Sequence, residues 1–343
     1  MKAVRYEAPG DFSVTDVPIP PVGPLDVRIR IHQSGVCGTD LHLHHGTYIG
    51  VYPLTPGHET IGEIDEVGAD VTRFRPGQRV TVNPNIYCGE CAYCLAGQVG
   101  RCANTEGMGV HRPGFFAEYA TADHRQVFSV DGLEPDTAVF AEPTACAMHG
   151  LETLGIRPGG SALVIGAGPT GLLLAQLIRS GGTTSVTVAD IVPFKLETAA
   201  ALGVDSTVSL TKDPEESLDL LRRASPSGDG YDNVVEATGV TAVGNICVPL
   251  TRDGGTVLIY GVTRPDDRLS VSPFELFRRE ITIKGSYAEM TSFGAAIAAL
   301  RTGRVRTDGI ISHRFSLDDY GKALDALASD PTAHKVVIEV AKP

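Results

Sequence analysis

The sequence predicts an α/β protein of two domains, one β-rich and one built on a doubly wound parallel sheet. Three observations lead to this fold class. At 343 residues the chain is long for one domain and sufficient for two. Up to residue 137 it is rich in Gly and Pro between short alternating runs, which is typical of strands and turns. After residue 137, short apolar runs alternate with helical stretches, which is typical of βαβ units.

The expected elements follow in chain order. Alternation starts at once in residues 1–6 and recurs in residues 27–31, so we expect both to be strands. Residues 141–154 should form a helix that ends at Pro158-Gly159-Gly160. Five apolar runs should form the parallel sheet: residues 161–165, 185–189, 233–237, 256–260 and 281–284. Beyond Gly285 we expect one helix, residues 292–301, and then mixed strand and helix.

Composition and charge exclude several classes of partner. The 42% hydrophobic and 20% charged content is ordinary for a globular protein. A formal net charge of -12 lacks the basic surface of a nucleic-acid binder and is repelled by anionic membranes. No apolar run reaches the roughly 18 residues of a membrane span, and the N-terminus lacks a signal peptide's apolar core. We therefore expect a cytoplasmic protein without nucleic-acid or membrane partners.

A glycine-rich stretch predicts a dinucleotide site. It follows the strand at residues 161–165, opens a helix, and reads Gly166-Ala167-Gly168-Pro169-Thr170-Gly171. In this pattern Gly166 permits a tight turn, Gly168 lets the backbone approach a pyrophosphate, and Gly171 allows close packing of helix and strand. The helix N-terminus offers free N–H groups to phosphates.

The next strand ends in an acid that predicts the cofactor. Asp190 lies about 20 residues beyond Gly171, where a carboxylate accepts hydrogen bonds from the adenosine ribose. It would repel a 2′-phosphate, which favours NAD over NADP. Lys195 is a second candidate for the ribose. The alternative is a solvated Asp in an ordinary turn.

Four of the seven cysteines lie within one short stretch and predict a metal site. The spacing is Cys88-x2-Cys91-x2-Cys94-x7-Cys102. Four thiolates can close a tetrahedron around Zn²⁺ with no open position, so this site should be structural. An iron–sulfur cluster is the alternative. Cys146 and Cys247, in apolar surroundings, should be small buried hydrophobic residues.

A second set of candidate ligands lies in Cys37-Gly38-Thr39-Asp40-Leu41-His42 and Gly57-His58-Glu59. Thiolate, imidazole and carboxylate together suit zinc, and three protein ligands leave a position for substrate. Glu142, at the start of a helix, is either a further ligand or a group that holds the metal's water. In isolation these residues are scattered, but a nucleotide motif and a four-cysteine loop in the same chain favour the metal interpretation.

These motifs together resemble the zinc-containing medium-chain alcohol and polyol dehydrogenases, over essentially the whole chain. The stretches that carry the resemblance are Gly57-His58-Glu59, Val67-Gly68, Pro76-Gly77-Gln78-Arg79-Val80, Cys88 to Cys102, Phe116-Ala117-Glu118-Tyr119 and Val164-Ile165-Gly166-Ala167-Gly168. The resemblance implies a GroES-like β-barrel catalytic domain, residues 1–145 and 286–343, with a structural zinc lobe at about 84–104. A Rossmann domain, residues 146–285, is inserted between them.

The resemblance also implies roles for single residues. Cys37 and His58 would bind one catalytic zinc, with Asp40 orienting His58. Glu59 resembles the ligand of the sorbitol dehydrogenase branch, in which the carboxylate at Glu142 binds the metal's water, whereas classical alcohol dehydrogenases have a Cys ligand there. Both assignments of the third ligand remain open, and Glu at 142 favours the polyol and sugar branch.

The implied reaction is the transfer of a hydride from a secondary alcohol to NAD. Zinc lowers the pKa of the substrate hydroxyl, and Thr39 accepts the proton and passes it toward His42 through the nicotinamide ribose. Similarity to arabinitol-type relatives favours a small polyol or sugar as substrate. The family also implies a homo-oligomer, a tetramer rather than a dimer.

The match weakens where the substrate would be read. The sorbitol dehydrogenase pattern has an Arg-Tyr pair, whereas this chain has Gly285-Ser286-Tyr287-Ala288-Glu289. Glu289 is either an acceptor for substrate hydroxyls or an exposed loop acid. Other zinc-dependent branches, of threonine, butanediol or glucose type, are alternative functions. A zinc-stabilised nucleotide sensor without activity is the alternative from another class, although Thr39 and His42 would be useless to it.

Overall fold

A computed structural model describes residues 1–47 and 49–341 and divides the chain into two compact units. Unit 1 contains Met1–Ala145, Glu289–Arg301 and the chain from Ile310 on. Unit 2 contains Cys146–Ala288 and Thr302–Gly309. In the described residues, no helix is both long and apolar enough to cross a membrane.

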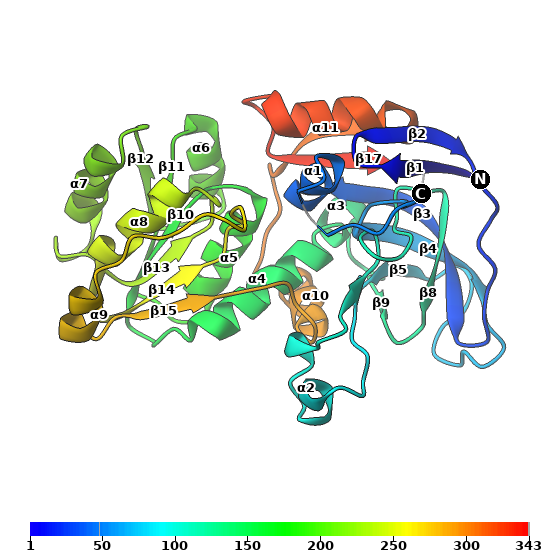
Figure 1. Ribbon diagram of the computed structural model, residues 1–343, viewed down its shortest axis with the longest axis horizontal. Coiled ribbons are helices and arrows are strands. Elements are labelled where there is room, and N and C mark those ends of the chain that lie inside the picture. Colours follow the sequence, from blue (N-terminus) through cyan, green and yellow to red (C-terminus); the bar gives the residue numbers. More distant parts are fainter. Residues whose placement is uncertain (48, 342–343) are drawn as a thin grey trace. The chain divides into compact units, whose positions relative to one another are not determined.

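Unit 1 is organised around a seven-stranded sheet (Figure 1). The strand order is β16-β17-β3-β4-β5-β9, with β8 paired to β3, and only the β16–β17 pair is parallel. Its strands are β3 (Asp26–Val36), β4 (Glu59–Val67), β5 (Arg79–Val82), β8 (Tyr119–Asp123), β9 (Val127–Ser129), β16 (Ile311–Ser316) and β17 (Lys335–Glu339).

Smaller elements of unit 1 surround this sheet. Two short antiparallel pairs are β1 (Lys2–Ala8) with β2 (Asp11–Asp16) and β6 (Asn85–Ile86) with β7 (Glu106–Gly107). The helices are α1 (Gly38–His44), α2 (Ala92–Leu95), η1 (Val99–Arg101), α3 (Pro135–Ala138), α10 (Phe293–Arg301), η2 (Leu317–Asp319) and α11 (Tyr320–Ser329). Helix α4 (Ala141–Leu154) begins in unit 1 and continues into unit 2.

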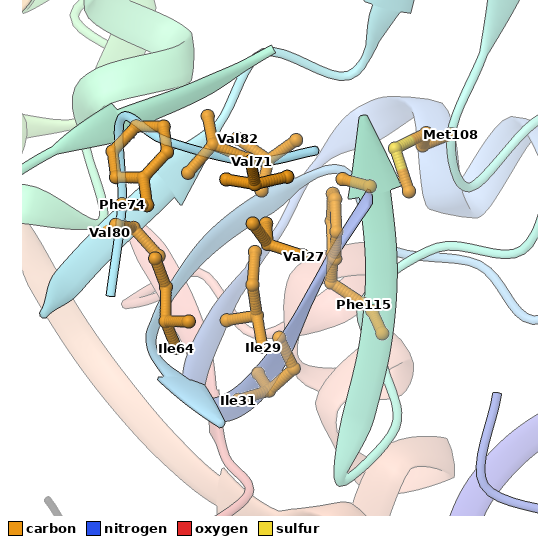
Figure 2. Close-up of a cluster of buried hydrophobic side chains, with 13 residues drawn as sticks. Val27, Ile29, Ile31, Ile64, Val71, Phe74, Val80, Val82, Met108 and Phe115 are labelled. Carbon is orange, nitrogen blue, oxygen red and sulfur yellow. The ribbon is translucent and has the colours of Figure 1, made fainter. Parts of the chain in front are cut away.

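The alternation seen in the sequence buries one face of this sheet. Val27, Ile29 and Ile31 of β3 are fully buried, as expected for period-two side chains. Figure 2 shows these side chains pointing toward Ile64, Val80 and other apolar residues from neighbouring strands. The strand ends that carry functional residues therefore start from a rigid, closely packed sheet.

Unit 2 is a six-stranded parallel sheet with helices between its strands (Figure 1). The strand order is β12-β11-β10-β13-β14-β15. The strands are β10 (Ser161–Ile165), β11 (Ser185–Asp190), β12 (Ser206–Ser209), β13 (Tyr231–Glu236), β14 (Thr251–Ile259) and β15 (Thr282–Gly285). The helices are α5 (Pro169–Ser180), α6 (Pro193–Ala201), α7 (Pro214–Ala224), α8 (Thr241–Leu250) and α9 (Pro273–Arg279).

This strand order confirms the doubly wound parallel sheet. The chain runs outward from β10 through β11 to β12, then returns to the other side of β10 as β13. Ile165 at the end of β10 is in register with Ala189 of β11 and with Glu236 of β13. The carboxyl ends of β10, β11 and β13 therefore meet at a switch point, which is where such sheets bind ligands.

Two segments are placed differently from the sequence-based boundaries. Residues 286–288 and Thr302–Gly309 belong to unit 2, although the sequence placed the whole of residues 286–343 in the other domain. For Thr302–Gly309 the physical reason is a side-chain to backbone link, because Gln176 of α5 donates to the Arg306 carbonyl and accepts from its N–H at 3.0 and 2.8 Å. Such a distant contact leaves no local pattern.

Candidate functional site

The first candidate metal site begins where β3 gives way to α1. Cys37 is the N-cap residue of this helix, in an extended conformation. Its backbone N–H donates to Asp40 Oδ2 at 2.9 Å, so the Asp40 carboxylate closes the first turn. This local contact fixes the Cys37 sulfur at the end of a buried strand.

His58 lies directly before β4 and faces the other oxygen of Asp40. Its Nδ1 is 3.8 Å from Asp40 Oδ1, and both side chains are buried. Burial alone lowers the pKa of His58, but the charges of Asp40 and Cys37 raise it well above its ordinary value. The pocket therefore favours positive charge, and Nδ1 facing Asp40 leaves Nε2 for a ligand.

Three residues supply ligand atoms close enough to share one ion. A sulfur of Cys37, a nitrogen of His58 and a carboxylate oxygen of Glu59 lie within 4.8 Å of one another. We call this group the catalytic cluster. Glu142 is not part of that group, although it is 8% exposed in the first turn of α4 and its charge acts on both His58 and Lys335.

Lys335, which the sequence analysis missed, pairs with Glu59. The two side chains form an ion pair and are 3% and 1% exposed. The charges of Glu59 and Cys37 overcome burial and raise the pKa of Lys335 above its ordinary value. The sequence gives one signal for this residue, because Lys335 begins an otherwise apolar run, residues 335–338.

Sheet register explains how this ion pair forms. Gly35 of β3 is opposite Glu59 of β4 and opposite Val337 of β17. A Cβ at Gly35 would lie 2.0 Å from Glu59 Oε2 and 2.8 Å from the Lys335 side chain. Glycine is therefore required there, because the carboxylate and the lysine stem occupy the space of a side chain.

Two further sequence candidates lie on α1 beside Cys37. Thr39 Oγ1 is 4.0 Å from Cys37 Sγ, and His42 Nδ1 is 3.0 Å from Thr47 Oγ1. Thr39 and His42 are three positions apart and so lie on the same side of the helix.

Glu289 is a buried acid in the same unit. It is 1% exposed, so its interpretation as an exposed loop acid is wrong. Its Oε1 accepts from Asn85 Nδ2 at 3.4 Å and its Oε2 from the Ser292 N–H at 3.2 Å. Burial and then the charge of Glu142 raise the pKa of Glu289 to about 7.

The four cysteines form a second candidate metal site, which we call the lobe. The sulfurs of Cys88, Cys91, Cys94 and Cys102 lie within 4.8 Å of one another. Strands β6 and β7, which flank this loop in the chain, pair antiparallel and so bring its two ends together. Backbone N–H groups point at the sulfurs, for example Cys88 N to Cys102 Sγ at 3.3 Å. Such bonds, led by that from Ala103, lower the pKa of Cys91 to about 6, which favours the thiolate.

The other cysteines differ from one another. Cys247 is fully buried and its pKa is raised by burial, as expected of a small buried hydrophobic residue. Cys146 is only partly buried, so that interpretation is wrong for it. The exposure of Cys146 depends on its position in helix α4. The apolar residues beside it in the sequence do not show how exposed it is.

The glycine stretch adopts the geometry expected of a nucleotide-binding turn. Gly166 has a φ of 114°, Gly168 is the N-cap of α5, and Pro169 and Thr170 begin the helix. A Cβ at Gly171 would lie 2.1 Å from the Gly166 carbonyl oxygen, so helix and strand meet without room for a side chain. Lys195 is partly buried in the first turn of α6.

Asp190 has a structural contact that the sequence did not reveal. Its Oδ2 accepts from the Ala167 N–H at 2.7 Å and its Oδ1 from the Val192 N–H at 2.9 Å. The carboxylate therefore fastens the glycine loop to the end of β11. Each oxygen of a carboxylate has a second lone pair, so acceptor capacity remains for a ribose hydroxyl.

Two known protein families match this chain. Residues 23–132 match the alcohol dehydrogenase GroES-like domain, and residues 169–301 match the zinc-binding dehydrogenase family. The GroES-like and Rossmann-like architecture expected from the sequence is therefore confirmed.

Individual relatives cover nearly all of the chain. D-arabinitol dehydrogenase 1 of Uromyces fabae is 39% identical over 96% of this chain and 94% of its own length. D-altritol 5-dehydrogenase of Agrobacterium fabrum (strain C58) is 36% identical over 98% of both. The crystal structure of a zinc-binding dehydrogenase of Sinorhizobium meliloti 1021, bound to NADP, is 36% identical over 98% of both chains with a TM-score of 0.92.

Proposed function

We propose a catalytic arrangement for this chain on the premise that it belongs to the zinc-containing medium-chain polyol dehydrogenases. The chain is an oxidoreductase that acts on a secondary hydroxyl of a small polyol. Our proposal concerns the residues that perform this reaction, the nicotinamide cofactor and the polyol. The observation that carries it is the catalytic cluster of Cys37, His58 and Glu59.

The residues of the catalytic cluster fit a zinc ion. A thiolate, an imidazole and a carboxylate within 4.8 Å of one another match the preferred ligands of Zn²⁺ and leave one position open. When bound, this ion supplies Lewis acidity that lowers the pKa of an alcohol. Asp40 holds the His58 ring so that Nε2 is available, and Lys335 neutralises the buried Glu59.

Glu59 is our proposed third ligand, in preference to Glu142. Its carboxylate is shared between the catalytic cluster and Lys335, whereas Glu142 is outside the group. Thr39, beside Cys37, is the proposed acceptor of the substrate hydroxyl proton, and His42 on the same helix face is its route to solvent. A nicotinamide bound by the glycine stretch would supply the hydride acceptor for this reaction.

A second, structural zinc is proposed for the lobe. Four sulfurs at mutual distances within 4.8 Å fit a closed tetrahedral site. N–H groups that already point at the sulfurs stabilise the charged thiolates. Thiolate ligands require a reducing compartment, which supports our proposal of a cytoplasmic protein.

NAD is our proposed cofactor, although a relative binds NADP. Asp190, at the end of β11, places a carboxylate where the 2′-phosphate of NADP would lie, and the two negative groups would repel each other. Because its oxygens also hold Ala167 and Val192, Asp190→Asn is the sharper variant, since it removes the charge and keeps one acceptor. We expect the preference for NAD over NADP to fall at least about tenfold. An unchanged preference would refute this role.

We also propose a homo-oligomer in which a second copy covers the β15 edge of unit 2. This edge strand leaves backbone groups open, and Phe274 and Phe277 of α9, the helix that precedes it in the chain, are 68% and 81% exposed. A two-fold axis beside such an edge would continue the sheet and bury both rings. Light scattering that gives the mass of one chain would contradict this.

A substrate panel tests the proposed function. The wild-type protein is assayed for nicotinamide reduction with D-arabinitol, D-altritol, L-threonine and 2,3-butanediol, each with NAD and NADP. We expect the highest kcat/KM with a polyol and NAD. A higher kcat/KM for threonine or butanediol would exclude a polyol as the main substrate, and no reaction with any alcohol would refute the enzymatic assignment.

A further inference from the structure

The backbone directly before His58 is held by the stretch between β7 and β8. Three consecutive carbonyl groups accept hydrogen bonds from backbone N–H groups of that stretch. The bonds run from Gly114 to Thr55 at 2.7 Å, from Phe116 to Pro56 at 3.0 Å and from Phe115 to Gly57 at 3.0 Å. Each peptide group that leads into His58 is therefore tied to a second segment of the chain.

This close packing requires three glycines. The φ angles of Gly57 and Gly109 are 96° and 80°, in the region that favours glycine. A Cβ at Gly109 would lie 2.3 Å from the Gly57 carbonyl oxygen, and one at Gly114 would lie 2.1 Å from the same oxygen. The obstructing atom belongs to the backbone, so no side chain can rotate away to make room. We call Gly57, Gly109 and Gly114 the glycine contact.

The stretch that encloses the Gly57 carbonyl is itself anchored in the core of unit 1. Met108 and Phe115 are buried in the apolar cluster of the sheet (Figure 2). Between them, the Gly109 N–H donates to the Arg112 carbonyl at 2.7 Å and closes a turn. The glycine contact therefore links the packed sheet to the peptide group before His58.

His58 depends on this backbone support because its side-chain contact is loose. Its Nδ1 is 3.8 Å from Asp40 Oδ1, which is longer than a hydrogen bond. Asp40 can therefore orient the ring but does not fix its distance from the other ligands. Zinc–ligand distances vary by only about 0.2 Å. Since a Cβ stays at least 3.0 Å from other heavy atoms, a Cβ at Gly114 would displace the Gly57 carbonyl or its surroundings by more than this tolerance.

We propose that Gly109 and Gly114 are positioning residues, which act through Gly57 to place the His58 ring for metal binding. This inference rests on the proposed role of the catalytic cluster as a zinc site. A side chain at either glycine would leave all three ligand groups present and would disturb their geometry. The metal would then bind more weakly at the catalytic cluster, while the lobe, whose sulfurs come from another stretch, would keep its affinity.

Gly114→Ala is the sharpest variant, because Gly114 is outside the left-handed region and the change affects only the available space. We expect the affinity of the catalytic cluster for zinc to fall about 10- to 100-fold, with that of the lobe unchanged. At one chelator concentration, zinc analysis should find about two ions in the wild-type protein and about one in the variant. Added zinc should restore activity to the variant at concentrations where the wild-type protein is already saturated.

Gly68→Ala is the matched control. A Cβ there would lie 2.1 Å from the Gly23 carbonyl oxygen, so the clash is as severe, but Gly68 follows the end of β4 opposite to Glu59. Urea unfolding should show a loss of stability in both variants, whereas only Gly114→Ala should lose affinity for zinc. Equal zinc affinities in the two variants, whether both match the wild-type value or both fall, would overturn the proposal.

A second measurement does not depend on the folding of Gly114→Ala. The N–H groups of Gly114, Phe115 and Phe116 should be protected from hydrogen exchange by the packed sheet and not by the catalytic ion. In Cys37→Ser their exchange rates, relative to those of β3, should therefore stay within about twofold of the wild-type values. Exchange at least about tenfold faster would show that the metal holds this segment, and would overturn the proposal. A wild-type protein that binds zinc only at the lobe would instead contradict the proposed function.

Discussion

The two cysteine-containing sites of unit 1 are built in opposite ways. The lobe takes all of its sulfurs from one stretch between Cys88 and Cys102, and all four cysteines are only partly buried. The catalytic cluster combines Cys37, His58 and Glu59 from the ends of two strands, and Lys335 from a third strand pairs with Glu59. One site is local in sequence, and the other depends on the packed sheet.

This difference indicates a separate role for the metal in each site. The lobe has few apolar side chains to bury, so bound zinc would replace a hydrophobic core and contribute folding free energy. The catalytic cluster is held by β3, β4 and β17 and by the Asp40 and Lys335 contacts. The packed sheet and these contacts therefore fix the positions of the ligand groups, which suits chemistry at an open position.

The largest expected effect separates the two sites by their cysteines. Cys37→Ser should lower kcat/KM at least about a thousandfold while the melting temperature changes little, because the cluster is supported by the sheet. Cys94→Ser should instead make the stretch between Cys88 and Cys102 sensitive to limited proteolysis. Steady-state kinetics and mass spectrometry of the digests check both. Retained activity in Cys37→Ser would contradict the assignment of catalysis to the catalytic cluster.

The next effect concerns the buried ion pair behind the catalytic cluster. Lys335→Met should lower the free energy of unfolding of the metal-free protein by about 3–5 kcal/mol, because Glu59 is left buried without its cation. Urea unfolding measures this loss, which should shrink when zinc is bound. Lys322→Met removes an exposed ion pair with Asp319 and is the control that should change stability little. Equal effects of the two variants would contradict a structural role for Lys335.

Glu289 gives a contrasting buried acid, since no ion pair of Glu289 occurs in the described residues. Its pKa is raised from 4.5 to about 7, so the folded state keeps a proton that the unfolded state has lost between these values. The associated stabilisation is present below pH 4.5 and is lost as the pH rises to about 7, by roughly 3 kcal/mol at most. Unfolding measured across this range should show the decline in the wild-type protein, and Glu289→Gln should lack that part of it. If the free energy of unfolding depended on pH in the same way in the wild-type protein and in Glu289→Gln, the pKa of Glu289 would not be raised.

The smallest effect tests how tightly the catalytic cluster is packed. Gly35→Ala places a Cβ 2.0 Å from Glu59 Oε2, so the carboxylate and Lys335 must shift. We expect a loss of about 1–3 kcal/mol in the free energy of unfolding together with reduced activity. Gly294→Ala in α10 is the control, because a Cβ there meets nothing within 4 Å. A harmless Gly35→Ala would show that the ion pair can rearrange freely.

What the sequence could reveal follows the same division. The lobe and the glycine turn have local signatures, since the spacing between Cys88 and Cys102 and between Gly166 and Gly171 is itself the geometry. Helix α4 and strand β10 have the bounds that periodicity predicted. By contrast, the contacts of Lys335 with Glu59, Asn85 with Glu289 and Gln176 with Arg306 join residues far apart in the chain. Strand register creates the first of these contacts and tertiary packing creates the other two, and no local pattern records them.

The zinc content of the purified protein and of Cys37→Ser tests the central claim most directly. We predict about two zinc ions per wild-type chain and about one in Cys37→Ser, with the four-cysteine lobe retaining its ion. A single zinc in the wild-type protein that persists in Cys37→Ser would contradict a metal in the catalytic cluster, and with it the proposed chemistry.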